Sequence, residues 1–225
     1  MKRRPAAKTS WLSVALVIAA VALWALDQKR ASDPPRKSET SRVETSASPE
    51  RAGSYETYQS CKLVEARNND GDSFILRLPD GRKEEFRLYF VDAPESAFKT
   101  YAGGRSNHER IRQQAAEMGG ITSQQAVDIG KKGKAFTLGL LGSAPVTIFT
   151  RWDSPFHDER YHAFVRVKDG GKDRWLHELL VERGLARIKT KPADLPGGDS
   201  AAHQLGRLRD LERQAKRNNA GAWGL

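Results

Sequence analysis

The chain has 225 residues, a length that permits one or two domains, and its 38 Lys and Arg outnumber its 28 Asp and Glu to give a formal net charge of +10. This charge favours a polyanionic partner, either nucleic acid or an anionic membrane surface, although solubility alone would also account for it. The single cysteine, Cys61, excludes an intramolecular disulfide and a zinc site made of cysteines.

The first segment, residues 1–26, places basic residues before an apolar run from Trp11 to Leu26. This order is typical of an export signal. The run is close to the lower length limit for a membrane span, and Ala20–Ala22 offers a cleavage site for a signal peptidase. We expect either an uncleaved signal-anchor or a cleaved signal peptide. The first would give a single-pass membrane protein facing outside the cytoplasm, and the second a secreted or periplasmic protein.

The second segment, residues 27–57, is rich in Ser, Pro and charged residues and has almost no large apolar side chains. Such a composition cannot bury enough surface to order itself, so we predict a disordered linker. Residues 58–225 then form one domain, which is basic in its own right.

The domain is predicted to contain five short strands, recognised by alternating apolar residues and by turn sequences such as Pro79-Asp80-Gly81. The predicted strands are 61–66, 73–78, 83–91, 145–150 and 161–167. Helices are predicted over 122–142, where Thr122 and Gln125 form a capping-box pattern, and over 175–183 and 201–218. Residues 96–121 form a partly helical excursion to which we assign no function.

Five strands with about three helices indicate an α+β fold built on a five-stranded barrel of the oligonucleotide-binding (OB) type. The second and third strands form a hairpin, which brings Asp70 and Asp72 at its start near Asp92 and Glu95 at its end. Carboxylates without histidine or thiol suit a hard cation such as calcium or magnesium. The same hairpin places Arg87 in an apolar run, where a buried guanidinium needs an anion. That anion is either a neighbouring carboxylate or a bound phosphate.

These acidic residues and Arg87 lie in a stretch that resembles a known family. The run D-G-D-S … F-R-L-Y-F-V-D-A-P-E is similar to the D-G-D-T … R-L-x-x-[IV]-D-[TA]-P-E pattern of the staphylococcal nuclease (thermonuclease) family. Further segments extend the resemblance over roughly residues 58–225: Gly133–Thr137, Glu182–Ala186 and Gln214–Trp223.

The resemblance implies a calcium-dependent phosphodiesterase on an OB-fold barrel that leaves 3′-phosphate ends. Asp72, Asp92 and the backbone carbonyl of Ala93 would then ligate Ca²⁺, with Asp70 supporting the metal site. Glu95 would orient or deprotonate the attacking water, and Arg87 would hold the phosphate.

The second arginine of the family corresponds to Arg160, which keeps its spacing to Ala163 but lacks the Tyr-Gly that precedes it in family members. We assign Arg160 the second phosphate contact, with Arg151 or Arg166 as substitutes if the loop is reshaped. The tyrosines that stack on the nucleotide are also missing. Lys189 and Lys191 stand in that region instead and could add affinity for phosphate.

The leading hypothesis is therefore a calcium-dependent endonuclease, exported or membrane-tethered, that cuts DNA and RNA with little sequence specificity. One alternative is a non-catalytic nucleic-acid-binding or scaffold module of the same fold. Another is a surface interaction domain whose positive charge only contacts an anionic lipid or polymer.

Overall fold

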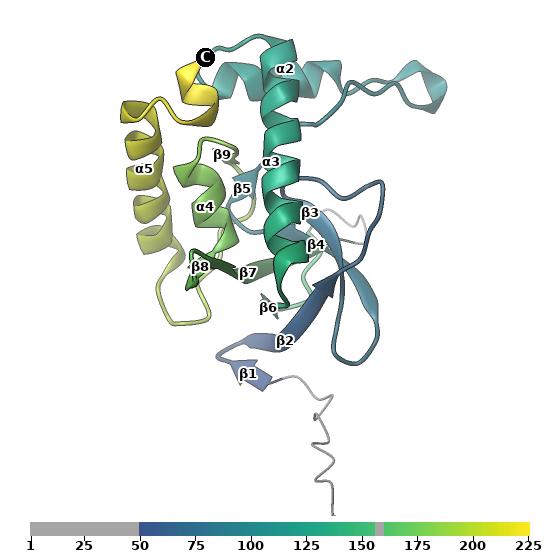
Figure 1. Cartoon of the computed structure of the whole chain (residues 1–225), viewed down its shortest axis with the longest axis vertical. Coiled ribbons are helices and arrows are strands. Elements are labelled where there is room, and N and C mark those ends of the chain that lie inside the picture. The colour runs from purple at the N-terminus through teal and green to yellow at the C-terminus, as the bar shows by residue number, and fades with distance from the viewer. Residues whose placement is uncertain (1–49, 156–159) are drawn as a thin grey trace, which may run out of the picture. The chain divides into compact units, whose positions relative to one another are not determined.

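The computed structural model describes residues 50–155 and 160–225, which form a β-barrel with helices packed around it (Figure 1). The predicted signal segment and residues 27–49 of the predicted linker lie outside the described residues. No helix within the described ranges is long and apolar enough to cross a membrane. Residues 50–57, which the sequence assigned to the end of the linker, contribute to strands at Glu50–Ala52 and Tyr55–Leu63.

The barrel has five strands, in the order β2-β3-β4-β7-β6, and it closes because β6 also pairs with β2. These strands are β2 (Tyr55–Leu63), β3 (Ser73–Arg77), β4 (Lys83–Leu88), β6 (Val146–Thr150) and β7 (Tyr161–Asp169). Every pairing is antiparallel except β4 with β7, which is parallel. Two short strands extend the sheet, β1 (Glu50–Ala52) beside β2 and β8 (Lys172–Trp175) beside β7. The predicted α+β class and five-stranded barrel are confirmed.

Alternating side chains of these strands fill the barrel. Phe74 and Leu76 of β3, Phe86 and Leu88 of β4, and Phe164 of β7 are all fully buried. Cys61 is buried among them, and burial raises the pKa of its thiol to about 12. The alternation therefore located the core side of the strands correctly.

Within residues 50–155 and 160–225, four α-helices accompany the barrel, one more than the roughly three predicted. They are α2 (His108–Glu117), α3 (Ser123–Ser143), α4 (Leu176–Glu182) and α5 (Ala201–Arg217), with short 3₁₀ turns at Ala102–Gly104 and Gly221–Gly224. The capping box that starts α3 is present, since Thr122 and Gln125 exchange side-chain and backbone hydrogen bonds. Figure 1 shows α3 standing alongside the barrel and α4 lying beside α5.

The predicted third strand, 83–91, is broken. β4 ends at Leu88, and Phe90 adopts a left-handed backbone conformation with φ of 68°. The chain therefore turns out of the barrel, and Val91–Asp92 (β5) pairs instead with Arg187–Ile188 (β9). This local change of direction decides where Asp92 lies, because it sets that residue opposite Arg187.

Candidate active site

The two ends of the predicted hairpin meet, and they meet around an arginine. The guanidinium of Arg87, on β4, donates from Nη2 to Asp92 Oδ1 at 3.0 Å and lies 3.5 Å from Asp72 Oδ2. All three side chains are at most 9 % exposed. Of the two anions expected beside Arg87, the structure thus shows the neighbouring carboxylates.

Helix α3 positions the two loops that carry these acids. A Cβ on Gly130 would lie 2.4 Å from the carbonyl oxygen of Glu95, so only glycine lets the helix approach this closely. Seven residues further along the helix, α3 also contacts the loop that carries Asp72, because Thr137 Oγ1 donates to the carbonyl of Gly71 at 2.8 Å. Gly130 and Thr137 of α3 therefore hold the two loops in place.

Asp92 receives more hydrogen bonds than any sequence pattern indicated. Besides Arg87, its oxygens accept from Arg110 Nη2 at 2.7 Å, from Gln114 Nε2 at 2.9 Å and from Arg187 Nε at 2.9 Å. Burial by itself would raise the pKa of Asp92, but these three arginines and the amide outweigh it and lower the pKa. Asp92 is therefore a carboxylate under ordinary conditions.

Asp72 has the opposite environment. Its Oδ2 is buried and makes no hydrogen bond with the described residues. Burial, followed by the nearby negative charge of Asp92, raises the pKa of Asp72 well above its ordinary range. A buried carboxylate with an unsatisfied oxygen next to a second carboxylate is a place where added positive charge would be stabilising.

The excursion at residues 96–121 contributes directly to the site, through residues that our sequence analysis left without a role. Gln114 of α2 is fully buried, accepts from the backbone N–H of Glu95 at 3.1 Å and donates to the carbonyl of Ala93 at 3.1 Å. Asn107, just before α2, donates to Glu95 Oε2 at 3.3 Å. The one available signal was that Arg110 and Gln114 lie four residues apart, on one face of a helix.

Glu95 lies at the edge of the cluster, with its side chain 16 % exposed. Its Oε1 lies 3.2 Å from Arg110 Nε in an ion pair, and Lys99 Nζ is 4.0 Å from Oε2. Asp70 does not join the Asp72–Asp92 pair. It bonds instead to the Gly71 N–H and to the hydroxyl of Ser96, which ties the two acidic loops together.

The two lysines proposed for phosphate binding are half-exposed and paired. Lys189 Nζ lies 3.2 Å from Glu117, and Lys191 pairs with Asp153. The residue of this segment that enters the site is Arg187, which bridges Asp92 and Glu117 at 2.8 and 2.7 Å. Arg187, Lys189 and Lys191 alternate along the chain, so in an extended strand they would share one face. Only Arg187 is opposite Asp92.

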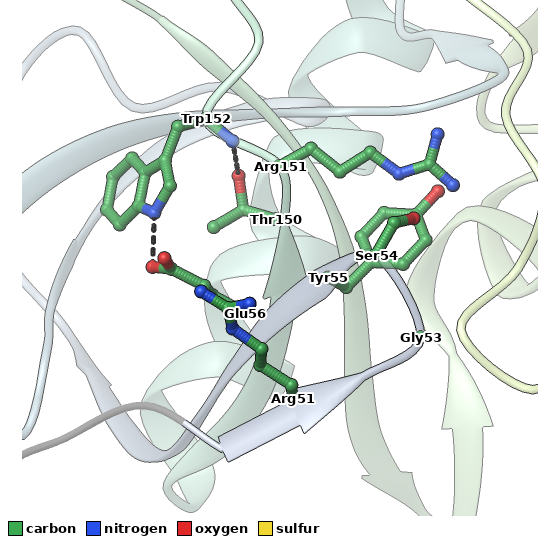
Figure 2. A pocket seen from close by; sticks show the side chains of 8 residues that line it. All are labelled: Arg51, Gly53, Ser54, Tyr55, Glu56, Thr150, Arg151 and Trp152. Carbon is green, nitrogen blue, oxygen red and sulfur yellow. Dashed lines mark hydrogen bonds between the residues drawn. The ribbon is translucent and has the colours of Figure 1, made fainter.

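The candidates for the second arginine occupy three different places. Arg160 immediately precedes β7, whose first residues pair with β4 around Arg87, so its backbone lies near the site. Arg151 instead belongs to a cavity of about 190 Å³, where its guanidinium stacks 4.1 Å from the centroid of the Tyr55 ring (Figure 2). Arg166 stacks on Trp175 at 4.7 Å. Of the three, Arg160 therefore remains the candidate, and its loop, 156–159, is outside the described residues.

The acidic residues can be tested against the calcium ion that the resemblance implies. Within the described residues no group of three or more His, Cys, Asp or Glu is arranged to hold a metal. A cation would thus rest on Asp72, Asp92, the Ala93 carbonyl and water, a ligand set of oxygens that suits a hard cation. The unsatisfied Oδ2 of Asp72 fits this role. Some of the hydrogen bonds that Asp92 and the Ala93 carbonyl accept would have to break for the cation to bind.

Comparison with known proteins does not show a family for the chain. No protein-family model matches the chain, and no curated protein gives a match. The resemblance to the staphylococcal nuclease family therefore stays a prediction from the residues quoted above.

Proposed function

We propose that the protein is a calcium-dependent endonuclease that hydrolyses phosphodiester bonds of DNA and RNA with little sequence specificity, on a barrel of the OB type. The observation that carries the proposal is the convergence of Asp72, Arg87 and Asp92 in one buried cluster, with Glu95 at its edge. The positive net charge and the resemblance of the sequence also support it. In this proposal the N-terminal segment places the enzyme outside the cytoplasm, anchored or released.

Asp72, Asp92 and the carbonyl of Ala93 would hold the Ca²⁺ ion. When bound, that ion supplies positive charge for the reacting phosphate and lowers the cost of ionising a nearby water.

The protein's own groups then carry the substrate and the proton. Arg87, with Arg160, binds the non-bridging phosphate oxygens, where negative charge builds up during attack. Glu95 accepts the proton of the attacking water, whose oxygen forms the new bond to phosphorus. The bond from phosphorus to the 5′-oxygen breaks, and that oxygen takes up a proton. The other product keeps a 3′-phosphate.

A second candidate function is a non-catalytic nucleic-acid-binding or scaffold module. One observation favours it: both oxygens of Asp92 already accept hydrogen bonds from Arg87, Arg110, Gln114 and Arg187. A carboxylate satisfied in this way needs no cation. The two candidate functions thus differ in whether Asp92 exchanges some of these hydrogen bonds for a cation.

The end groups of the products test the proposal. With Ca²⁺ and an end-labelled oligonucleotide, the wild type should give 3′-phosphate products, and Asp72→Asn should lower the rate at least about a hundredfold because a metal ligand is lost. Mass spectrometry of the fragments identifies the ends. Binding by the wild type without any product would favour the scaffold function.

A further inference from the structure

One arginine of the site comes from outside the barrel. Arg110 lies in the first turn of α2, and its guanidinium bridges Asp92 Oδ1, at 2.7 Å from Nη2, and Glu95 Oε1, at 3.2 Å from Nε. It therefore touches both the carboxylate proposed to hold a cation and the carboxylate proposed to activate water.

Exposure separates Arg110 from the other two arginines at Asp92. Its side chain is 42 % exposed, whereas those of Arg87 and Arg187 are 8 % and 7 % exposed. A phosphodiester that approaches from solvent meets Arg110 first. The buried pair has little freedom to change partners, while a half-exposed guanidinium can exchange one anion for another at low cost.

Arg110 also lies where it could bind the same phosphate group as Arg87. Its Nη2 and that of Arg87 both hydrogen-bond Asp92 Oδ1, so the two nitrogens lie within about 6 Å of each other. Two guanidinium forks at this separation can contact different oxygens of one phosphate group.

We propose that Arg110 is a third phosphate-binding arginine of the site, supplied by α2. On substrate binding its guanidinium exchanges Glu95 for a phosphate oxygen, which leaves Glu95 Oε1 able to accept the proton of water. The proposal rests on the proposed function for the reaction, but it also makes a statement about binding alone. It gives the 96–121 excursion a role in recognising the nucleic-acid backbone.

The chain offers a matched control on the same helix. Arg112 is 67 % exposed and pairs only with Glu109 among the described residues, so its removal takes away the same charge without touching the site. We would compare the full-length wild type with Arg110→Ala, Arg110→Lys and Arg112→Ala. Arg110→Gln serves in place of alanine if the latter unfolds, because it keeps a polar group beside Asp92. Thermal melting verifies that each variant is folded.

The first readout is the affinity for a single-stranded oligonucleotide in chelator, over a series of salt concentrations. Loss of one phosphate contact reduces the slope of log affinity against log salt by about 0.7, and we expect this for Arg110→Ala together with about tenfold weaker binding at low salt. Arg112→Ala should keep the wild-type slope. Arg110→Lys should recover the slope and only part of the affinity, since the ammonium lacks the planar fork.

The second readout is cleavage by the same proteins in Ca²⁺. If the wild type cuts, Arg110→Ala should raise KM as well as lower kcat. A wild-type salt slope in Arg110→Ala, with only kcat reduced, would show that Arg110 merely positions Asp92 and Glu95, and this proposal would be wrong. Absence of cleavage by the wild type would count against the nuclease, while the salt slopes would still decide whether Arg110 contacts phosphate.

Discussion

Asp72 and Asp92 contact the same guanidinium, yet their environments drive them in opposite directions. Asp92 is stabilised as an anion by three arginines and an amide, whereas Asp72 has a buried oxygen without a hydrogen bond and a raised pKa. The negative charge of Asp92 is thus well compensated by its neighbours, whereas that of Asp72 is compensated less. That imbalance is the residue-level argument for a cation in the site.

The proposed role of Glu95 as the proton acceptor can be tested by a single substitution. Glu95→Gln keeps the size of the side chain and one oxygen for Arg110, but it removes the proton acceptor. We expect kcat to fall at least about a hundredfold with only a modest change in calcium affinity. Single-turnover cleavage and calorimetric calcium titration measure the two effects.

Glu109→Gln is the control for Glu95→Gln, since Glu109 is 78 % exposed and pairs with Arg112 on the outer face of α2. Its cleavage rate should equal that of the wild type. An unchanged rate in Glu95→Gln itself would remove the assigned role in activating water.

At the scale of elements, the site depends on how closely α3 approaches the loop that carries Glu95. A Cβ at Gly130 would overlap the carbonyl oxygens of Pro94, at 2.5 Å, and Glu95, at 2.4 Å. Gly139, in the same helix, is exposed and has no atom within 4 Å of such a Cβ. The two glycines therefore form a matched pair for substitution by alanine.

We predict that Gly130→Ala costs about 1–3 kcal/mol of unfolding free energy, as overpacking does, and also lowers cleavage because the loop must move. Gly139→Ala should stabilise the protein by about 0.5–1 kcal/mol and leave cleavage unchanged. Urea unfolding and a cleavage assay on both variants provide the measurements. Equal effects of the two substitutions would contradict the close approach of α3.

A buried histidine between α4 and α5 leads us to expect that the stability of the fold depends on pH. His177 is buried, with its Nε2 2.8 Å from Gln204 Nε2, beside a pair formed by Glu178 and Arg207 at 2.7 Å. Burial, and then the charge of Arg207, lowers the pKa of His177 to about 3 from an ordinary value of 6.5. The unfolded chain therefore binds a proton that the folded chain does not, and stability is lost as the pH falls from about 6.5 toward 3.

At pH 4.5 this loss amounts to about 2–3 kcal/mol relative to pH 7. Urea unfolding of the wild type and His177→Gln at both pH values isolates the contribution of this histidine. The variant should be less stable at pH 7, but its stability should fall by about 2–3 kcal/mol less on acidification. Parallel losses in the two proteins would mean that His177 does not control the acid sensitivity.

For the whole molecule, alternation and turn chemistry predicted the strands, and the number of strands and helices indicated the barrel. Phe74 and Leu76 faced the core as their spacing required, and Thr122 capped α3 through its own side chain. These features depend on residues close together in the chain. Asp72 and Asp92 come close because they flank the hairpin that β3 and β4 form.

The rest of the site depends on distant contacts, which carry no local pattern. Arg187 reaches Asp92 across 95 residues, and only the turn at Phe90 brings them opposite each other. Arg110 and Gln114 lie 18 and 22 residues from Asp92, in a segment interrupted by glycines. The sequence therefore predicted the carboxylates and Arg87 but not the second layer of donors that surrounds them.

The most direct test of the account is a cleavage assay on the purified full chain, wild type and Arg87→Ala. Single-stranded DNA, duplex DNA and RNA would each be incubated in calcium, magnesium or chelator. The account predicts calcium-dependent cutting of all three substrates by the wild type, reduced at least about a hundredfold in Arg87→Ala because transition-state charge loses its partner. Binding without cutting by the wild type in every condition would contradict it and leave the non-catalytic module as the function.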